Sequence, residues 1–179
     1  MVADMDGFNP TRVSGETGIS MLPAFGPGNR VWFSRLTNSG MFITNDGARD
    51  RPLIQGNGLN MGVSICGNKM FFTSSRDGNS EIYSANIDGT GVRRLTNNPA
   101  IDVSPACGPN GKVAFVSQRH GSPQIFVMDQ DGSNARRVTF RGSHNQTPAW
   151  CQLPGKQLLA FTGRDGTLDI FTLDLATTE

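Results

Sequence analysis

Residues Lys112–Thr139 read KVAFVSQRHGSPQIFVMDQDGSNARRVT. The two apolar runs in this stretch, Val113–Val116 and Ile125–Met128, have the length of short strands and are joined by a segment rich in turn-forming residues. An Asp131-Gly132 dipeptide then precedes a third, shorter run, and Asp-Gly supplies the left-handed conformations that tight hairpin turns require. The pattern predicts an antiparallel meander of three strands.

The meander recurs along the chain. Asp-Gly pairs are spaced by 40 to 43 residues, at Asp6-Gly7, Asp46-Gly47, Asp88-Gly89 and Asp131-Gly132. A repeat of this length with four strands per unit is typical of β-propeller blades. Because a single four-stranded sheet cannot bury both of its faces, the blades stack around a common axis. We therefore expect an all-β fold, a β-propeller of about four four-stranded antiparallel blades, with almost no helix.

Each unit divides into four strands, counted from the innermost, next to the axis, to the outermost. The innermost strands are predicted at 22–25, 62–66, 104–107 and 147–150. The second strands are predicted at 30–35, 69–74, 112–117 and 157–162, and the third strands at 40–45, 81–87, 124–130 and 168–175. The outermost strands are predicted at 52–55, 92–96 and 136–140.

These strands group residues 1–179 into a single propeller domain or propeller fragment. Its blades are predicted at 22–55, 62–96 and 104–140, with a final blade of three strands at 147–175 and a partial third strand and an outermost strand within 1–15. A strand at 11–14 would complete the final blade by strand exchange and so remove an open sheet edge. A strand-like segment at 2–5 would be left over, which indicates a piece of a longer propeller.

Composition excludes several classes of function. The formal net charge of +1 at pH 7 provides no basic surface of the kind that binds nucleic acid. No apolar run approaches the roughly 18 residues of a membrane span, so we expect no membrane insertion. The N-terminal sequence MVADMDGFNP has neither the basic nor the apolar region of a secretory leader, so a leader is expected to be absent from this chain.

Three cysteines, Cys66, Cys107 and Cys151, lie 41 and 44 residues apart, and no Cys-x-x-Cys motif or Cys/His cluster suggests a metal site. Cys66 and Cys107 fall at matching positions of the repeat. Equivalent positions in neighbouring units usually lie farther apart than the Cα separation of about 4.4–6.8 Å that a disulfide needs. We therefore expect all three cysteines to be buried, small apolar residues without a bridge.

Three segments resemble the blades of the TolB family: Ser75–Tyr83, Ser117–Asp129 and Gly132–Thr139. The loop and strand Gly142–Trp150 favour this family over related propellers. The resemblance implies a six-bladed propeller in the parent protein, of which this chain would be the C-terminal part, without the separate N-terminal domain of the family. It further implies periplasmic localisation in the Tol–Pal system of the cell envelope and binding of Pal, a peptidoglycan-associated lipoprotein.

Two repeated features have ordinary structural interpretations. The Asp-Gly segments lack the glycine and glutamate positions of an EF-hand, so we interpret them as hairpin turns and expect no metal. Arginines recur near the end of the second strands, at Arg35, Arg76, Arg119 and Arg164. A residue that repeats in every blade is expected to serve the blade itself, by pairing with a nearby carboxylate or carbonyl.

Residues that contact a partner are instead expected in the loops that do not repeat. The loops between blades and the loops between second and third strands share one face of a propeller. The candidate partner-binding residues there are Glu16, Asn60, Asp102, His120, His144, Asn145 and Gln146. Neither histidine lies in a recognisable catalytic arrangement, so we expect no catalytic residue and no cofactor.

The sequence thus predicts a non-enzymatic protein-binding propeller, and the resemblance names Pal as its partner. Self-association through edge strands is an additional expectation. Two alternatives stay open: a propeller portion of a prolyl-oligopeptidase-like hydrolase, and an engineered or truncated propeller fragment without activity of its own.

Overall fold

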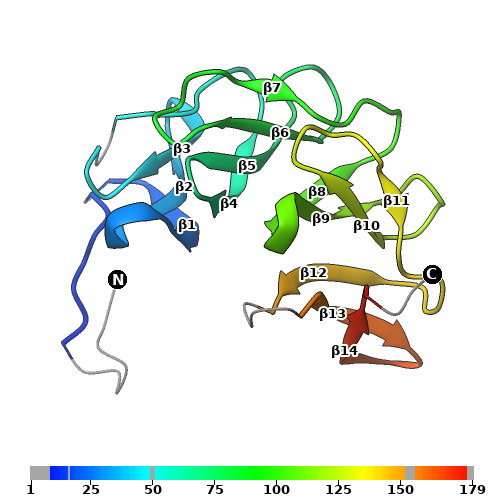
Figure 1. The fold of residues 1–179 in the computed structure, drawn as a ribbon. Helices are drawn as coiled ribbons and strands as arrows, with labels where there is room; N and C mark the ends of the chain where they lie inside the picture. Colours follow the sequence, from blue (N-terminus) through cyan, green and yellow to red (C-terminus); the bar gives the residue numbers. More distant parts are fainter. Residues whose placement is uncertain (1–8, 16, 49–50, 152–155, 177–179) are drawn as a thin grey trace.

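The computed structural model describes residues 9–15, 17–48, 51–151 and 156–176. Four antiparallel sheets follow one another in chain order around an open arc, and each strand lies beside its sequence neighbour (Figure 1). This order is the one expected for propeller blades. Among the described residues, no helix has the length and hydropathy of a membrane span.

The second and third strands agree closely with the predicted boundaries. The first sheet contains β1 (Ile19–Phe25), β2 (Val31–Thr37) and β3 (Gly40–Asn45), and the second contains β4 (Asn60–Cys66), β5 (Lys69–Ser74), β6 (Glu81–Asn86) and β7 (Arg93–Arg94). The third contains β8 (Asp102–Cys107), β9 (Lys112–Ser117), β10 (Gln124–Asp129) and β11 (Arg136–Arg137), and the fourth contains β12 (Asn145–Trp150), β13 (Leu158–Asp165) and β14 (Thr167–Asp174). Two short 3-10 turns, η1 (Pro27–Asn29) and η2 (Pro109–Gly111), are the described helical elements.

The innermost strands begin two or three residues earlier than predicted, because each contains a bulge that interrupts its alternation. The register of every innermost strand against its neighbour shifts at this bulge. The bulged residue has a positive φ in all four strands, at Leu22, Gly62, Ser104 and Thr147. The outermost strands are shorter than predicted, and in the first sheet the outermost strand is reduced to one bridge between Ile43 and Ile54.

Apolar side chains fill the layers between neighbouring blades. Trp32, Ile43, Met70 and Phe72 belong to the layer between the first two blades, and similar clusters fill the next two junctions. The second and third strands of the two middle blades are covered on both faces, which is why β5 and β10 are buried almost throughout. Continuous burial explains why these strands are uninterrupted apolar runs in the sequence.

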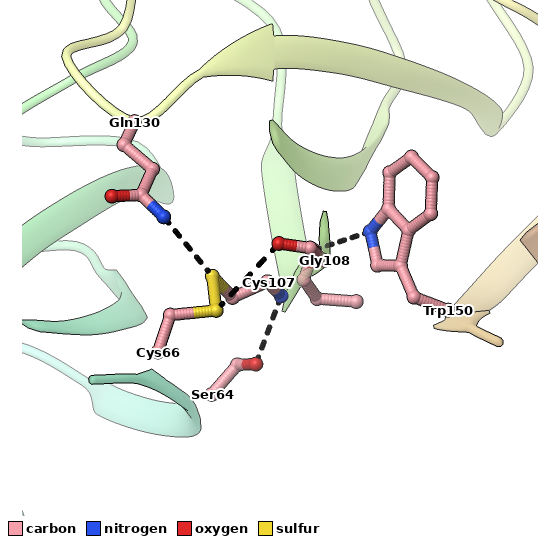
Figure 2. The surroundings of a disulfide bond; sticks show 7 residues. Ser64, Cys66, Cys107, Gly108, Gln130 and Trp150 are labelled. Carbon is pink, nitrogen blue, oxygen red and sulfur yellow. Dashed lines mark hydrogen bonds between the residues drawn. A yellow bond between two sulfur atoms is a disulfide. The ribbon is translucent and has the colours of Figure 1, made fainter. Parts of the chain in front are cut away.

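A disulfide joins Cys66 at the end of β4 to Cys107 at the end of β8 (Figure 2). The expectation of three unbridged cysteines is therefore wrong for this pair. Innermost strands converge near the axis: the Cys107 N–H donates to Ser64 Oγ at 2.9 Å, and the two cysteine Cα atoms lie 6.0 Å apart. Cys151 is a free, half-buried cysteine.

The described part of the chain does not show the expected strand exchange. Among the residues that the structure describes, the final sheet has the order β12-β13-β14, without a fourth strand. Residues 12–15 instead line a cavity with Arg30, Asp46 and Gly47 of the first blade, at the other end of the arc. Predicted segment 2–5 lies outside the described residues.

Candidate functional site

The candidate site is the face of the arc on which the innermost strands begin, here called the loop face. The loops between blades and the loops between second and third strands both lie on it, because the strands of each blade are antiparallel. The disulfide and the Asp88-Gly89 and Asp131-Gly132 turns lie on the opposite face. The loop face is therefore the place where non-repeating side chains gather.

Buried ion pairs and hydrogen bonds hold this face in position. Arg119 follows β9, and its Nη2 donates to Asp102 Oδ2 at 2.8 Å while its Nε donates to Ser117 Oγ at 2.8 Å. In the preceding blade Arg76 bonds Asn60 Oδ1 and Ser74 Oγ at 2.8 and 2.9 Å. The prediction that these arginines serve their own blades is confirmed by both pairs.

Arg35 is also held by hydrogen bonds, but to different partners. Its side chain donates to Ser20 Oγ and to the carbonyl of Thr17. Arg164 differs from the other three. Its side chain is exposed, and its described hydrogen bonds are made by the backbone: its N–H donates to the His144 carbonyl at 2.8 Å, and its carbonyl accepts from the Ser143 N–H at 3.1 Å.

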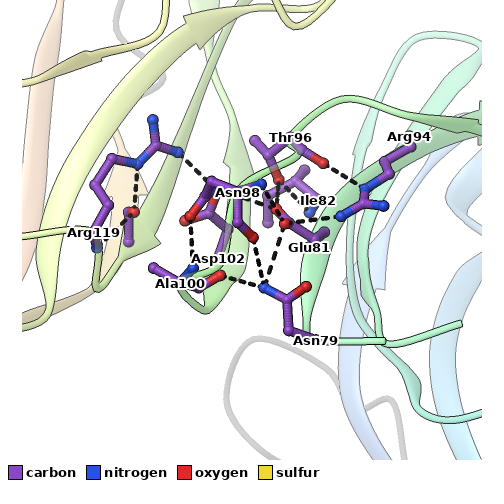
Figure 3. A network of polar contacts seen from close by, with 10 residues as sticks. Asn79, Glu81, Ile82, Arg94, Thr96, Asn98, Ala100, Asp102 and Arg119 are labelled. Carbon is purple, nitrogen blue, oxygen red and sulfur yellow. Dashed lines mark hydrogen bonds and ion pairs between the residues drawn. The ribbon is translucent and has the colours of Figure 1, made fainter. Parts of the chain in front are cut away.

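A larger polar network connects the second and third blades around Glu81, whose side chain is fully buried (Figure 3). Glu81 Oε1 accepts from Arg94 Nη2 at 3.0 Å and from the Asn98 backbone N–H at 2.8 Å, and its Oε2 accepts from the Thr96 hydroxyl. Asn98 Nδ2 also donates to Asp102 Oδ2 at 2.8 Å. One inter-blade loop is thus fixed to two blades at once.

The next junction repeats this arrangement without charge. Gln124 occupies the position of Glu81 and Asn145 the position of Asp102, as the strand registers show. Gln124 Oε1 accepts from the Thr139 hydroxyl at 2.8 Å and from Asn145 Nδ2 at 2.9 Å, and Gln124 Nε2 donates to the Gly142 carbonyl. A neutral amide pair and a charged carboxylate network therefore do the same structural work.

The structure separates the predicted site residues into two groups. Asn60, Asp102 and Asn145 are at most 3 % exposed, and each is held by hydrogen bonds within the chain, so they position the loops. His120 and His144 are exposed and Gln146 is half-buried, all on the loop face. Glu16 lies outside the described residues.

Sequence reasoning missed Glu81 and Asn98, which make more contacts than most of the predicted residues. The available signal was a carboxylate at the start of an otherwise apolar third strand, because a buried charge must have partners. His120 stacks on Phe126 with a 5.8 Å centroid distance, so its ring is oriented although it is exposed. Among the described residues its ring nitrogens make no hydrogen bond.

The Asp-Gly turns have the local structure expected of hairpin turns. Asp88 Oδ1 accepts from the backbone N–H and the hydroxyl of Thr90, and Asp131 Oδ1 does the same with Ser133. The hydrogen bonds from Thr90 lower the pKa of Asp88, and those from Ser133 lower the pKa of Asp131. Among the described residues, no group of three or more His, Cys, Asp or Glu side chains is arranged to hold a metal ion.

Sheet order, blade length and repeated arginine anchors define the chain as a β-propeller with blades of the TolB type. The family description "TolB beta propeller domain" matches residues 1–179, and the chain belongs to this family. The Tol-Pal system protein TolB of Anaeromyxobacter dehalogenans strain 2CP-C is 42 % identical over 108 residues, which cover 57 % of this chain and 25 % of that protein. The chain thus spans about a quarter of that curated relative.

Solved structures show the same relationship. TolB from Acinetobacter baumannii superimposes with a TM-score of 0.83 at 28 % identity, over 98 % of this chain and 46 % of that one. A puromycin-hydrolyzing peptidase of Mycobacterium tuberculosis gives a TM-score of 0.72 at 12 % identity, over 97 % of this chain and 29 % of that one. At this identity the second match establishes a shared propeller fold and nothing about activity.

Proposed function

We propose that the chain is a non-catalytic, protein-binding part of a propeller that acts in the Tol–Pal system, and that its loop face binds Pal. One observation carries the proposal: the inter-blade loops are fixed by buried anchors, while His120, His144 and Gln146 remain accessible beside them. A surface that is rigid before binding loses little conformational entropy on association. The name of the relatives, Tol-Pal system protein TolB, supports Pal as the partner that we propose.

A hydrolytic function has less support. Within the described part of the chain, neither His120 nor His144 is hydrogen-bonded to a serine or a cysteine, which is the contact that activates a nucleophile in triad enzymes. The peptidase neighbours share the propeller, and in such enzymes a fold alone does not supply catalytic groups.

The disulfide supports an exported location. Structural disulfides form and persist in oxidising compartments such as the bacterial periplasm, and they are rare in the cytosol. Because Cys66 and Cys107 are bonded while Cys151 is free, protein recovered from the periplasm should contain one alkylatable thiol. Three alkylatable thiols in unreduced protein would contradict this location.

Titration calorimetry with the soluble domain of a Pal-type lipoprotein tests the partner. We expect saturable binding that the triple variant His120→Ala, His144→Ala, Gln146→Ala weakens at least about tenfold, equal to about 1.4 kcal/mol. Arg136→Ala is the matched control, because Arg136 is exposed on the outermost strand β11 and makes no described side-chain contact. Absence of binding, or an equal effect of both variants, would refute the proposed contact surface.

We also propose that two copies associate through the ends of the arc. Ile19 and Phe25 are 59 % and 67 % exposed at one end, and Leu168 and Ile170 are 60 % and 74 % exposed at the other. In a propeller such apolar faces are normally covered by the next blade. Light scattering over a concentration series tests this idea, and a monomeric mass at every concentration would contradict it.

A further inference from the structure

The third blade encloses a guanidinium group between polar and aromatic atoms. The Arg119 Cζ atom lies 5.7 Å from the centroid of the Phe115 ring and 4.5 Å from that of Phe126. The two rings are themselves 5.7 Å apart. The same guanidinium bonds Asp102 and Ser117, so aromatic faces and polar acceptors together form a slot for one cation.

The second blade has the same slot with the same occupant. Arg76 Cζ lies 5.7 Å from the Phe72 centroid and 5.1 Å from the Tyr83 centroid, and the two rings are 5.9 Å apart. Asn60 and Ser74 accept its hydrogen bonds. Two blades with different aromatic and acceptor residues therefore position a guanidinium in one geometry.

The fourth blade contains the walls of this slot. Strand register places Phe161 and Phe171 at the positions of Phe115 and Phe126, and their rings are stacked 5.8 Å apart. Asn145 stands at the position of the acceptor, and within the described residues its Oδ1 accepts no hydrogen bond. Both Nδ2 hydrogens are used, and Asn145 lines the cavity beside these rings.

Within the described part of the chain no arginine side chain bonds Asn145 Oδ1, and the loop between the second and third strands of the fourth blade is shorter. Seven positions separate the paired residues Ser74 and Glu81 of the second blade, whereas six separate Gly163 and Asp169 of the fourth. The deletion moves Arg164 one position toward the strand. Since neighbouring residues of a strand point to opposite faces, Arg164 does not take the register position of Arg76 and Arg119. That position is held by the short Asp165, and Arg164 is exposed at the wall of the cavity described next.

A cavity of about 410 Å³ lies at this place, between the third and fourth blades. Its walls include Phe161, Phe171, Asn145 and Asp165, and its rim includes the 75 % exposed Phe140. This volume is far more than the roughly 10–15 Å³ that a cavity needs to hold one water molecule.

We propose that this cavity binds a guanidinium group supplied from outside the chain. The two phenylalanine rings would face the cation, Asn145 Oδ1 would accept one of its hydrogen bonds, and the Asp165 carboxylate would pair with its charge. The arginine side chain of a peptide and a free guanidino compound offer the same chemistry. The proposal is independent of Pal.

Two positive charges near the cavity oppose the binding of a cation. Arg141 and Arg164 also line the cavity, and both side chains are exposed. Their charges are screened by solvent, whereas Phe161 is only 9 % exposed and Phe171 36 % exposed, and a cation–π contact strengthens as water is excluded from it. An anionic ligand held by the two arginines is the competing outcome of the test.

The test is an NMR titration of the ¹⁵N-labelled chain with Nα-acetyl-arginine amide. We expect saturable shifts at the amides of Gly142, Gly163 and Phe171, and affinity at least about tenfold weaker for the uncharged isostere Nα-acetyl-citrulline amide. Free L-arginine forms a second arm: tighter binding of the capped compound identifies a peptide arginine, and tighter binding of the free amino acid a small molecule. Equal affinity for arginine and citrulline, or binding of Nα-acetyl-glutamate amide instead, would overturn the proposal.

Three variants test whether the slot is free of the Arg164 side chain and open to an added cation. Insertion of one serine between Gly163 and Arg164 restores the spacing of the other blades, so Arg164 should fill the slot, abolish binding and raise the Tm. Asp165→Asn should weaken binding severalfold without a change in spacing. Arg164→Ala should bind at least as tightly as the parent, since a like charge is removed. If Arg164→Ala instead loses as much Tm as Arg119→Ala, Arg164 already occupies the slot and the proposal is wrong.

Discussion

Reduction of the Cys66–Cys107 disulfide should destabilise the chain by an amount that can be calculated. The bridge joins residues 41 positions apart. In the chain-entropy description, closing a loop of this length removes unfolded-state entropy worth about 4 kcal/mol at 25 °C. For a chain of 179 residues, 1 kcal/mol corresponds to about 2–4 °C in Tm, so the reduced protein should unfold about 8–16 °C lower.

Thermal unfolding of the same preparation with and without a phosphine reductant measures this difference, because no side chain is changed. Cys66→Ala with Cys107→Ala should give a similar shift that reductant does not increase. Cys151→Ala is the control: it removes the free thiol and should remain as sensitive to reductant as the parent chain. A shift below about 2 °C on reduction would refute the argument that the innermost strands depend on their covalent bond.

Three further predictions concern single residues. Glu81→Ala should cost about 3 kcal/mol in urea unfolding, because it leaves Arg94 without its buried partner, whereas Glu81→Gln should cost clearly less; equal losses would contradict the charge-pair explanation. Burial, with the hydrogen bond to Asp77, raises the pKa of Tyr83 to about 12. As the unfolded tyrosine titrates near 10, stability should be fully present below pH 10 and fall toward pH 12, and absorbance near 295 nm will follow this single tyrosine; an apparent pKa near 10 would contradict it. Ser104→Gly should raise stability by about 1 kcal/mol, because Ser104 has a φ of +55°, and an unchanged urea midpoint would show that the bulge is not strained.

The architecture could be predicted because each strand carries its own signal. The second and third strands of the two middle blades are buried on both faces, so β5 and β10 carry apolar runs, and the tight turns that follow the third strands carry Asp-Gly. The bulges could not be predicted in the same way. Leu22 and Thr147 hold a left-handed conformation that their residue types disfavour, and only the geometry of the innermost strand imposes it.

The disulfide was missed because repeat periodicity gives the order of units and not the distance between equivalent positions. That distance changes with radius: equivalent residues are far apart at the rim and close at the axis. Cys66 and Cys107 belong to innermost strands, where the Cα separation is 6.0 Å and satisfies the geometric requirement. A sequence argument would have needed the radial position of each strand to reach the same result.

The candidate partner-binding residues were predicted because their residue types differ from blade to blade. Several of them nevertheless have the same structural role in their blades. The position occupied by Asn60, Asp102 and Asn145 changes residue type from blade to blade but always places a small polar side chain at the start of an innermost strand. The shared feature of this position is a buried hydrogen-bond acceptor within reach of a guanidinium or amide donor. The residue type alone does not reveal this feature, because it changes between blades. The fourth blade differs from the others at this contact. It has the acceptor and both aromatic rings, but its arginine is displaced by one position. A functional difference between blades is therefore expected where one member of a repeated contact is missing, and at Asn145 the missing member is a cation.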